Sequence, residues 1–293
     1  MDTIKCVNLL GPRGTFTDIA FDRFNDIYKK IFDKYDIMYY KSIDEVVLNT
    51  NNDFSCGVIP IENSLDGYVQ RTLDLLHENK MFILDEIIVP IRFDLVINGK
   101  DLSDIKKIYV QFKTNGQCRK LLNSLKDVEV ITTESNMESY NMVMMNKPNE
   151  AAIIPSHITV NDNSKTVFKN VCDSMNNNTR FYLISKVPSF IDSKLSSCEK
   201  IKISICIIPS GDRPGLLLDI LKTMSNDKLN MVSIMSRPTK TNLGTYNFYI
   251  EIEALKEDEP FIINTLNKMN NNDVTIEILG NYALRGDNEN KII

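Results

Sequence analysis

The stretch that decides the fold of this chain is GVIPIENSLDGYVQRTLDLL, which runs from Gly57 to Leu76. Its apolar beginning predicts a short strand over residues 56–59 that Pro60 ends, and the apolar residues after position 68 recur at helical spacing. Between strand and helix lie a carboxylate, an amide and a hydroxyl group, carried by Glu62, Asn63 and Ser64. Open α/β sheets bind ligands where their strands end, so this turn is a candidate ligand site. The same residue types also cap helices that bind nothing.

The composition is that of a globular protein with a small-molecule or protein partner. The chain has 293 residues, of which 43% are hydrophobic and 25% charged, and this length predicts two or three domains. Its net charge of −5 arises from 34 basic and 39 acidic residues without a long run of Lys and Arg. The sequence therefore indicates neither a nucleic-acid partner nor a membrane surface.

Cysteine and histidine usage argues against a metal or redox centre. The six cysteines are scattered and none stands in a CxxC pair. His77 and His157 are the only histidines and lie far apart, so a Ser-His or Cys-His dyad is disfavoured. The N-terminus has no basic leader and no later segment has 18 uninterrupted apolar residues, so we expect a soluble, cytoplasmic protein without a metal.

The beginning of the chain predicts a strand, a tight turn and a helix. Residues 4–10 are mostly apolar and predict a strand, 11–14 read Gly-Pro-Arg-Gly, and Thr15 with Asp18 resembles a capping box. The unpaired amides at the start of a helix favour anions, and Arg13 would add a cation there. A plain strand-to-helix connection is the equally acceptable alternative.

The order of predicted elements indicates an α/β fold with two lobes. Strand and helix alternate three times up to His77, with Ser42 and Glu45 forming a second capping box. Two strands then follow without a helix, at 82–91 and 92–97, before alternation resumes with a strand at 105–110 and a helix at 116–125. A strand at 181–185 would return to the first lobe, and the two crossings predict a ligand-binding cleft between the lobes.

The last third of the chain predicts a separate domain. Residues 186–199 are serine-rich and form the best linker candidate. Beyond them the pattern is β-α-β-β-α-β, the ferredoxin-like order. Its elements are expected at 202–208, 216–225, 231–237, 245–253, a helix opened by 258–260, and 274–279.

Four separated stretches occur in the order found in one enzyme family. They are GPRGTFTDIAF at 11–21, the stretch at 57–76, NNTRFYLI at 177–184, and DRPGLLLDIL at 212–221 followed by SRP at 236–238 and LGTYNFYIEIE at 243–253. Together they resemble the monofunctional prephenate dehydratases, including their C-terminal ACT domain.

The resemblance implies a catalytic domain over residues 1–188 built of two periplasmic-binding-protein-like lobes. Lobe one would comprise about 1–78 and 179–188, and lobe two about 79–178. A linker at 189–199, an ACT regulatory domain at 200–285 and a tail at 286–293 would follow.

The implied reaction removes carbon dioxide and the ring hydroxyl of prephenate to give phenylpyruvate, without metal or organic cofactor. Phenylalanine would act as allosteric effector, and pairing of ACT domains between subunits implies a homodimer or homotetramer. Arogenate as substrate, a catalytically impaired phenylalanine-binding sensor, and a decarboxylase that retains the ring hydroxyl remain alternatives.

The resemblance also implies site residues. Thr179 matches the catalytic threonine and is expected to donate a hydrogen bond to the departing hydroxyl. Arg180 would either bind a substrate carboxylate or pair with Glu62 or Asp66. The full set of expected substrate-binding residues is Thr15, Phe16, Glu62, Asn63, Ser64, Arg180, Phe181, Ser135 and Lys113.

Two regions depart from the family pattern. The second lobe has Val110-Gln111-Phe112-Lys113 where many members have Ser-His-Pro-Gln, and Lys113 could supply a cation in place of the lost groups. Met235 stands where the family has Glu before Ser-Arg-Pro, which removes an acceptor. The expected phenylalanine-binding residues are Asp212, Gly215, Leu216, Leu217, Leu218, Ser236, Arg237 and Pro238.

Overall fold

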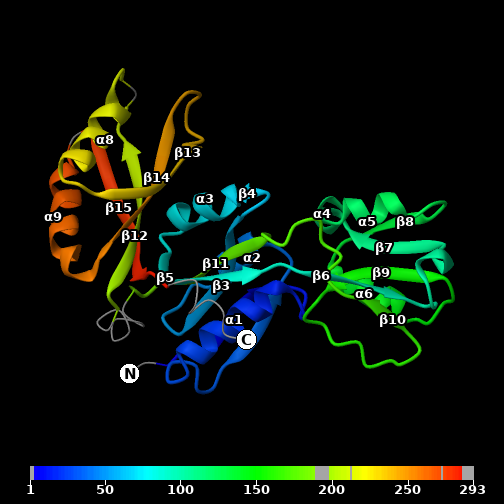
Figure 1. Ribbon diagram of the computed structural model, residues 1–293. Coiled ribbons are helices and arrows are strands. Elements are labelled where there is room, and N and C mark those ends of the chain that lie inside the picture. The colour runs from blue at the N-terminus through cyan, green and yellow to red at the C-terminus, as the bar shows by residue number, and fades with distance from the viewer. Residues whose placement is uncertain (1–2, 189–197, 212, 272, 286–293) are drawn as a thin grey trace.

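The computed structural model describes residues 3–188, 198–211, 213–271 and 273–285. Among these residues the strands form two sheets, one of ten strands and one of five (Figure 1). The larger has the order β13-β14-β12-β15-β5-β11-β3-β1-β2, with β4 pairing with β3, and the smaller has the order β10-β6-β9-β7-β8. This is a mixed α/β architecture, as the alternating pattern predicts.

The first lobe contains the half of the large sheet that carries α1 to α3. Strands β1, β2 and β3 are parallel, and β11 inserts antiparallel between β3 and β5. Strands β1, β3, β5 and β11 are largely buried, as expected where helices cover a sheet, whereas the edge strand β2 is exposed or half-buried. The elements are β1 (Cys6–Leu10), α1 (Phe16–Ile27), β2 (Asp36–Tyr40), α2 (Ile43–Asn49), β3 (Ser55–Asn63), β4 (Gly67–Tyr68), α3 (Gln70–Glu78), β5 (Phe82–Pro90) and β11 (Asn178–Ser185).

The second lobe is the smaller sheet with its helices. The chain reaches it between β5 and β6 and leaves it between β10 and β11, so two segments cross between the lobes (Figure 1). Its elements are β6 (Phe93–Ile97), η1 (Leu102–Asp104), β7 (Lys107–Gln111), α4 (Phe112–Gln117), α5 (Arg119–Ser124), β8 (Glu129–Thr133), α6 (Asn136–Val143), β9 (Glu150–Pro155) and β10 (Thr166–Phe168).

The C-terminal unit supplies the other half of the large sheet. Its order is β-α-β-β-α-β, with the short helix η3 before α9, as the sequence predicts. Figure 1 shows α8 and α9 on the side of its sheet turned away from the first lobe. The elements are β12 (Lys200–Pro209), α8 (Leu216–Asn226), β13 (Asn230–Pro238), β14 (Tyr246–Leu255), η3 (Lys256–Asp258), α9 (Glu259–Met269) and β15 (Val274–Ala283).

Three expected boundaries are wrong. The second lobe begins after Pro90 rather than at residue 79, because β5 pairs with β11 and β15 inside the large sheet. Pro60 does not end β3, which continues to Asn63 past an irregularity in its pairing with β11. The expected helix at 116–125 is two short helices that meet at Cys118.

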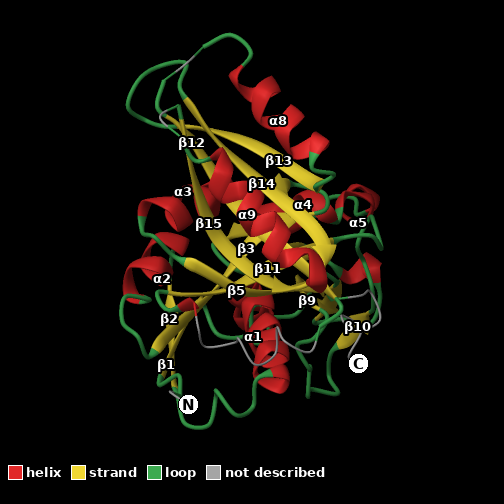
Figure 2. Ribbon diagram, turned by 90° about the vertical axis from the view of Figure 1, so that its left-hand side faces the viewer, coloured by secondary structure: helices red, strands yellow, loops and turns green. Residues whose placement is uncertain are grey.

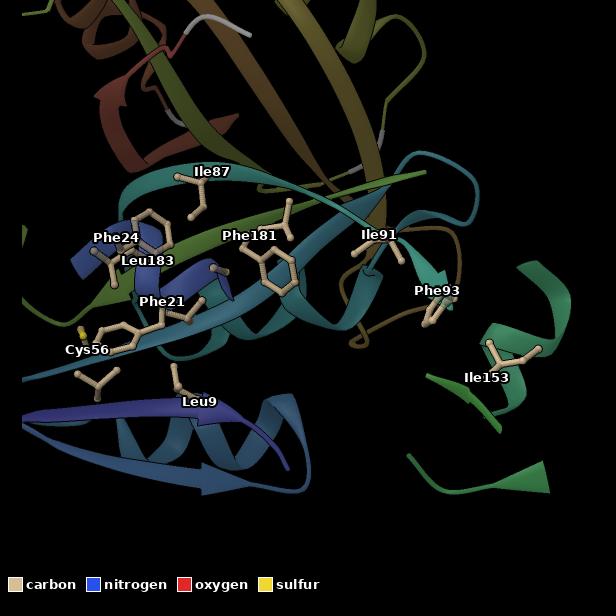
Figure 3. Packing of buried hydrophobic residues seen from close by; sticks show 14 of the residues in the cluster. Leu9, Phe21, Phe24, Cys56, Ile87, Ile91, Phe93, Ile153, Phe181 and Leu183 are labelled. Atoms are coloured by element: carbon tan, nitrogen blue, oxygen red, sulfur yellow. The ribbon is translucent and has the colours of Figure 1, made fainter. Parts of the chain in front are cut away.

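One hydrophobic core extends from the first lobe into the second. Phe21, Phe24 and Leu183 lie in the first lobe, while Phe93 and Ile153 belong to β6 and β9 (Figure 3). The strands before and after each crossing contribute apolar residues to this core. They are β5 and β6 at the first crossing and β10 and β11 at the second. The two lobes are therefore joined by packing as well as by the chain.

The C-terminal unit joins the first lobe edge to edge at one residue pair, Gly280 with Ile83 (Figure 2). A Cβ atom at Gly280 would lie 2.5 Å from the carbonyl oxygen of Ile83 and 2.7 Å from its Cβ. Only glycine permits this approach of two backbones. The absence of a side chain at position 280 is thus a requirement of the junction.

Gly280→Ala is expected to lower the free energy of unfolding by about 1–3 kcal/mol, the usual cost of forcing an extra atom into a packed site. Urea denaturation measures this directly. Gly116→Ala is the matched control, because a Cβ there meets nothing within 4 Å and the residue lies in a helix. Equal midpoints for the two variants would contradict the close approach.

Residues 189–197 of the expected linker and the whole of the expected tail at 286–293 lie outside the described residues. Among the helices that the structure describes, none is long and apolar enough to cross a membrane.

Candidate functional site

Thr179 lies at the start of β11, where the chain returns from the second lobe. It is 9% exposed and pairs across the sheet with Asn63, the last residue of β3. The buried faces of both strands set this antiparallel register. Two residues far apart in the sequence, from two of the family-like stretches, thereby become neighbours.

The side-chain amide of Asn63 is the centre of a hydrogen-bond network. Its Oδ1 accepts from two backbone N–H groups of the following turn, at 2.9 and 3.0 Å, which determines how the amide is oriented. Its Nδ2 lies 2.9 Å from Thr179 Oγ1, 2.8 Å from Asn177 Oδ1 and 3.2 Å from the carbonyl oxygen of Asn178. An amide nitrogen only donates, so the Thr179 hydroxyl accepts this bond and retains its own proton for another acceptor.

In the described part of the chain, no acceptor for the Thr179 proton lies within hydrogen-bond distance. A threonine hydroxyl accepts two hydrogen bonds and donates one. Thr179 is therefore arranged as a donor whose position is held by Asn63. The sequence predicted both residues for the site, and the structure brings them together.

Ser64 differs from its expected role as a substrate contact. Its Oγ donates to the carbonyl oxygen of Asn176 at 2.7 Å and accepts from the N–H of Asn178 at 3.0 Å. Its own N–H donates to the carbonyl oxygen of Asn178 at 2.9 Å. Ser64 thus uses its hydroxyl to fasten the crossing segment to the end of β3, because that segment carries unpaired backbone groups past it.

The sequence-based prediction missed three residues that hold the same segment. Arg92 donates to the carbonyl oxygens of Asn177 and Met175, at 2.7 and 2.5 Å. Asn177 in turn donates to Gln117 Oε1 at 3.0 Å. Asn177 stands two positions before Thr179 in the NNTRF stretch, which is a usable signal, whereas nothing local distinguishes Arg92 from an ordinary surface arginine.

The expected capping box at the start of α1 is present in the structure. The N–H groups of Gly14 and Thr15 donate to Asp18 Oδ2 at 2.8 and 3.0 Å, and Tyr39 donates to Asp18 Oδ1 at 2.5 Å. The Thr15 hydroxyl donates to the carbonyl oxygen of Leu10 at 3.3 Å. Asp18 thus takes up the two amides that precede the helix, and the expected role of Thr15 in substrate binding stays a prediction.

Phe16 lies where the two lobes touch. Its ring makes edge contacts with Phe93 at 5.6 Å and with His157 at 5.1 Å, measured between ring centroids. His157 Nε2 lies 3.0 Å from the carbonyl oxygen of Gly14, and burial lowers the pKa of His157. A neutral His157 therefore donates through Nε2 and links the second lobe to the turn before α1.

The side chain of Arg180 does not lie beside that of Thr179. Successive strand residues point to opposite faces, so Arg180 points toward the C-terminal unit while Thr179 points toward α1. Its guanidinium pairs at 3.0 Å with Glu62, at 3.0 Å with Glu86 and at 2.9 Å with Glu251. The pairing with Glu62, one of the expected alternatives for Arg180, is the arrangement observed, and a substrate-binding role of either residue stays a prediction.

Phe181 is a core residue rather than a substrate contact. Its side chain is 3% exposed and packs in the cluster that contains Leu183 and Ile87 (Figure 3). A ring with this degree of burial has its surface covered by protein. The expectation for Phe181 is therefore corrected as well.

Two expected contacts of the second lobe lie at helix starts. The Ser135 hydroxyl accepts from the N–H of Glu138 at 3.1 Å and caps α6, which accounts for the serine without a ligand. Lys113 is exposed in the first turn of α4, where Gln111 caps the helix by accepting from the N–H of Lys113 at 2.8 Å. Of Ser135 and Lys113, only Lys113 has an exposed side chain.

A second site lies in the C-terminal unit as a cavity of about 500 Å³. The start of α8 and the β13–β14 hairpin form its walls, and Gly215 stands there with a φ of +84°. The expected effector residues among its lining are Gly215, Leu216, Leu217 and Leu218. An apolar wall beside the exposed amides of a helix start suits a small amphipathic ligand.

The other expected effector residues are placed differently. Arg237 pairs with both oxygens of Asp74 on α3 at 2.8 Å and donates to Gln70 Oε1 at 2.6 Å. Ser236 and Pro238 flank it as exposed residues of β13, and none of the three lines the cavity. The reason is again strand alternation, which turns Arg237 toward the first lobe. Asp212 lies outside the described residues.

Cys172, in the crossing segment, is predicted to be the most reactive cysteine. Its hydrogen bond with Cys118 outweighs burial and lowers the pKa of Cys172 to about 7, while burial raises the pKa of Cys6 and Cys198. Only the thiolate is nucleophilic, so iodoacetamide should alkylate Cys172 first, with a rate that rises through about pH 7.

Peptide mapping at a series of pH values measures this reactivity. Cys118→Ala, which removes the hydrogen bond, should move the midpoint of the Cys172 profile upward. A wild-type rate that rises only above about pH 8, the range of an ordinary thiol, would contradict the effect of Cys118.

No group of three or more histidine, cysteine or acidic side chains that could hold a metal ion occurs in the described ranges of the chain. The site around Thr179 consists of hydroxyl, amide and guanidinium groups. Groups of this kind can bind and polarise a small polar molecule through hydrogen bonds.

A family model described as prephenate dehydratase matches residues 7–189 of the chain. A protein of Methanocaldococcus jannaschii described as prephenate dehydratase is 34% identical over 282 residues, which cover 96% of this chain and 98% of that protein. The prephenate dehydratase of Lactococcus lactis subsp. lactis is 28% identical over 281 residues, which cover 94% and 96%.

Solved structures show the same similarity. The prephenate dehydratase of Staphylococcus aureus has 27% identity and a TM-score of 0.73, covering 96% of this chain and all of that one. A prephenate dehydratase of Arthrobacter aurescens in complex with L-Phe has 25% identity and a TM-score of 0.73, covering 95% of this chain and 90% of that one.

Proposed function

Because the chain belongs to the prephenate dehydratase family, we propose that the Thr179 hydroxyl donates a hydrogen bond to the departing ring hydroxyl of prephenate. The observation that carries this proposal is the hydrogen bond of 2.9 Å from Asn63 Nδ2 to Thr179 Oγ1. In this bond the Thr179 hydroxyl is the acceptor, so its own proton remains available for a hydrogen bond to a substrate. The chain is an enzyme of phenylalanine biosynthesis, and its reaction would place it among the carbon–oxygen lyases.

The chemistry follows from the two bonds that break. The bond from the ring to its carboxylate breaks to release carbon dioxide, and its electron pair shifts through the ring double bonds to expel the hydroxyl group from the opposite ring carbon. The ring becomes aromatic as this hydroxyl leaves, and the departing hydroxide takes up one proton from solvent to become water. A neutral threonine is a weak acid, so Thr179 would act by donating a hydrogen bond that stabilises the negative charge on the departing oxygen.

Other residues expected in the site would position the substrate. Asn63 holds the Thr179 hydroxyl, and Phe16 contributes an apolar surface where the lobes touch. Lys113 is exposed and would supply a cation for one of the two substrate carboxylates. No step of this proposal requires a cofactor.

The division of the chain would follow the two sheets. We assign residues 1–188 to a catalytic domain with two periplasmic-binding-protein-like lobes and residues 200–285 to an ACT domain. The β-α-β-β-α-β order of the C-terminal unit and the crossings between the lobes support this assignment. The lobe boundary moves to residue 90, because β5 belongs to the large sheet.

Phenylalanine would bind in the cavity of about 500 Å³ beside Gly215, Leu216, Leu217 and Leu218. The cavity is of the size that accommodates a small amino acid, and the complex of the Arthrobacter aurescens protein with L-Phe supports this choice of effector. We also propose a homodimer or homotetramer in the cytoplasm, formed through the C-terminal units.

A phenylpyruvate assay with purified protein and prephenate, with and without L-phenylalanine, tests the proposal. We expect turnover that phenylalanine changes, and a higher kcat/KM for prephenate than for arogenate measured in parallel. Protein that binds phenylalanine but converts neither acid would support the sensor alternative. A product that retains the ring hydroxyl, seen by mass spectrometry, would indicate a simple decarboxylase instead.

A further inference from the structure

A buried ion cluster joins the strand that carries Thr179 to the C-terminal unit. The side chains of Arg180 and Glu251 are 11% and 10% exposed, and Arg180 Nη1 lies 2.9 and 3.0 Å from the two carboxylate oxygens of Glu251. Tyr182 adds a hydrogen bond of 2.6 Å to Glu251 Oε1. Lys202 on β12 reaches Glu86 on β5 at 2.6 Å, so the cluster has members on both sides of the junction.

The strand β14 connects this cluster with the effector cavity. Tyr246 and Phe248 line the cavity, and Glu251 follows Phe248 by three positions on the same strand. Alternation places Phe248 and Ile250 against the helices of the C-terminal unit, while Tyr249 packs in the core shared with the first lobe. Strand β14 therefore has the cavity on one face and, on the other face, Glu251, which pairs with Arg180 of β11.

The β13–β14 hairpin has the same two-sided arrangement. Arg237 pairs with Asp74 and Lys240 pairs with Glu78 on α3, whereas the hairpin residues that line the cavity are Thr239, Thr241, Asn242, Gly244 and Thr245. A ligand that shifts the hairpin must therefore act on contacts with the first lobe. Unlike these two ion pairs, the pair of Glu251 with Arg180 involves the residue that directly follows Thr179 in the chain.

We propose that Glu251 is a positioning residue for Thr179, acting through Arg180, and that this contact transmits the state of the effector cavity to the catalytic site. The proposal rests on the proposed function. It names the route by which phenylalanine would alter turnover.

The energetics of buried charge make such a contact sensitive to small movements. Glu62, Glu86 and Glu251 carry three negative charges, and Arg180 and Lys202 carry two positive charges. Arg180 Nε is buried without a hydrogen-bond partner among the described residues. Buried pairs depend on good geometry, so a rearrangement at Glu251 changes how Arg180 is held and hence where the Thr179 hydroxyl points.

The test compares Glu251→Gln with Glu253→Gln in the full chain. Glu253 lies two residues along the same strand, is 30% exposed on its side chain and contacts Lys202 at 3.6 Å. For Glu251→Gln we expect kcat for prephenate to fall about ten-fold with KM little changed, the pattern of a lost transition-state alignment. Its response to L-phenylalanine should weaken by about five-fold or more, within the usual range of allosteric coupling. Calorimetric affinity for L-phenylalanine should stay close to that of wild type.

Hydrogen exchange of the wild-type protein gives a measurement independent of any variant. Adding L-phenylalanine should change exchange in peptides from β14 and also from β11, and Glu251→Gln should abolish the change in β11 alone. A change confined to β14, or identical kinetics and regulation in both glutamine variants, would overturn the proposal. If wild-type protein fails to convert prephenate at all, the proposed function fails instead, so the two failures are distinguishable.

Discussion

Thr179→Val is expected to lower kcat for prephenate by about 100-fold or more, the usual effect of removing a catalytic hydrogen-bond donor. Valine keeps the β-branched shape that suits the start of strand β11 but has no hydroxyl. The loss should fall on kcat more than on KM, because the donor acts on charge that develops only as the ring hydroxyl departs.

Thr179→Ser is the matched control, since it restores the hydroxyl and should recover most of the activity. Asn63→Ala should cause a smaller loss, because it frees the Thr179 hydroxyl from its anchor without removing it. Thermal denaturation of each variant checks that the fold is retained. Wild-type turnover by a folded Thr179→Val protein would remove Thr179 from the mechanism.

Arg285→Met is expected to lower the free energy of unfolding by about 3–5 kcal/mol, because it leaves a buried carboxylate without its cation. Arg285 follows β15 and pairs with Asp85 of β5, whose side chain is fully buried and which also accepts from the Tyr28 hydroxyl at 2.5 Å. The contact fastens the end of the C-terminal unit to the first lobe. Urea denaturation monitored by circular dichroism measures the change.

The loss should depend on pH in a definite direction. Burial already raises the pKa of Asp85 despite the opposing charge of Arg285, and removal of Arg285 raises it further. The folded protein then binds more protons than the unfolded chain above about pH 4, so stability falls as the pH rises through this window. Arg285→Met should therefore be less destabilised at about pH 5 than at about pH 8.

Asp85→Asn combined with Arg285→Met should recover part of the stability and remove most of the pH dependence, because no buried charge is then left unpaired. Lys29→Met, which breaks the exposed pair with Asp26 at 3.3 Å, is the control and should change stability by less than about 1 kcal/mol. An equal loss at both pH values would indicate that packing, rather than the charge of Asp85, causes the effect.

Local signals in the sequence were sufficient for the order of the elements. The period of the apolar residues separates strands from helices, and the hydroxyl of Ser42 caps α2 by accepting from the N–H of Glu45 at 3.2 Å, as its spacing predicts. Asn63 and Thr179 were also within reach of the sequence, because the stretches that contain them resemble one family. Neither signal depends on contacts between distant segments.

The partners of the charged and polar side chains were decided only by the tertiary structure. Ser64 and Arg237 were expected at ligand sites and Arg180 either there or paired with Glu62, and each bonds to groups of the protein. Strand alternation predicts that Thr179 and Arg180 point to opposite faces, but not that the C-terminal unit brings Glu251 to one of them. Burial makes an unpaired charge costly, so each charge is paired by whichever distant segment the fold places nearby. The sequence by itself thus determined the elements and the family, while the packing of those elements decided which polar residues remain available for a substrate.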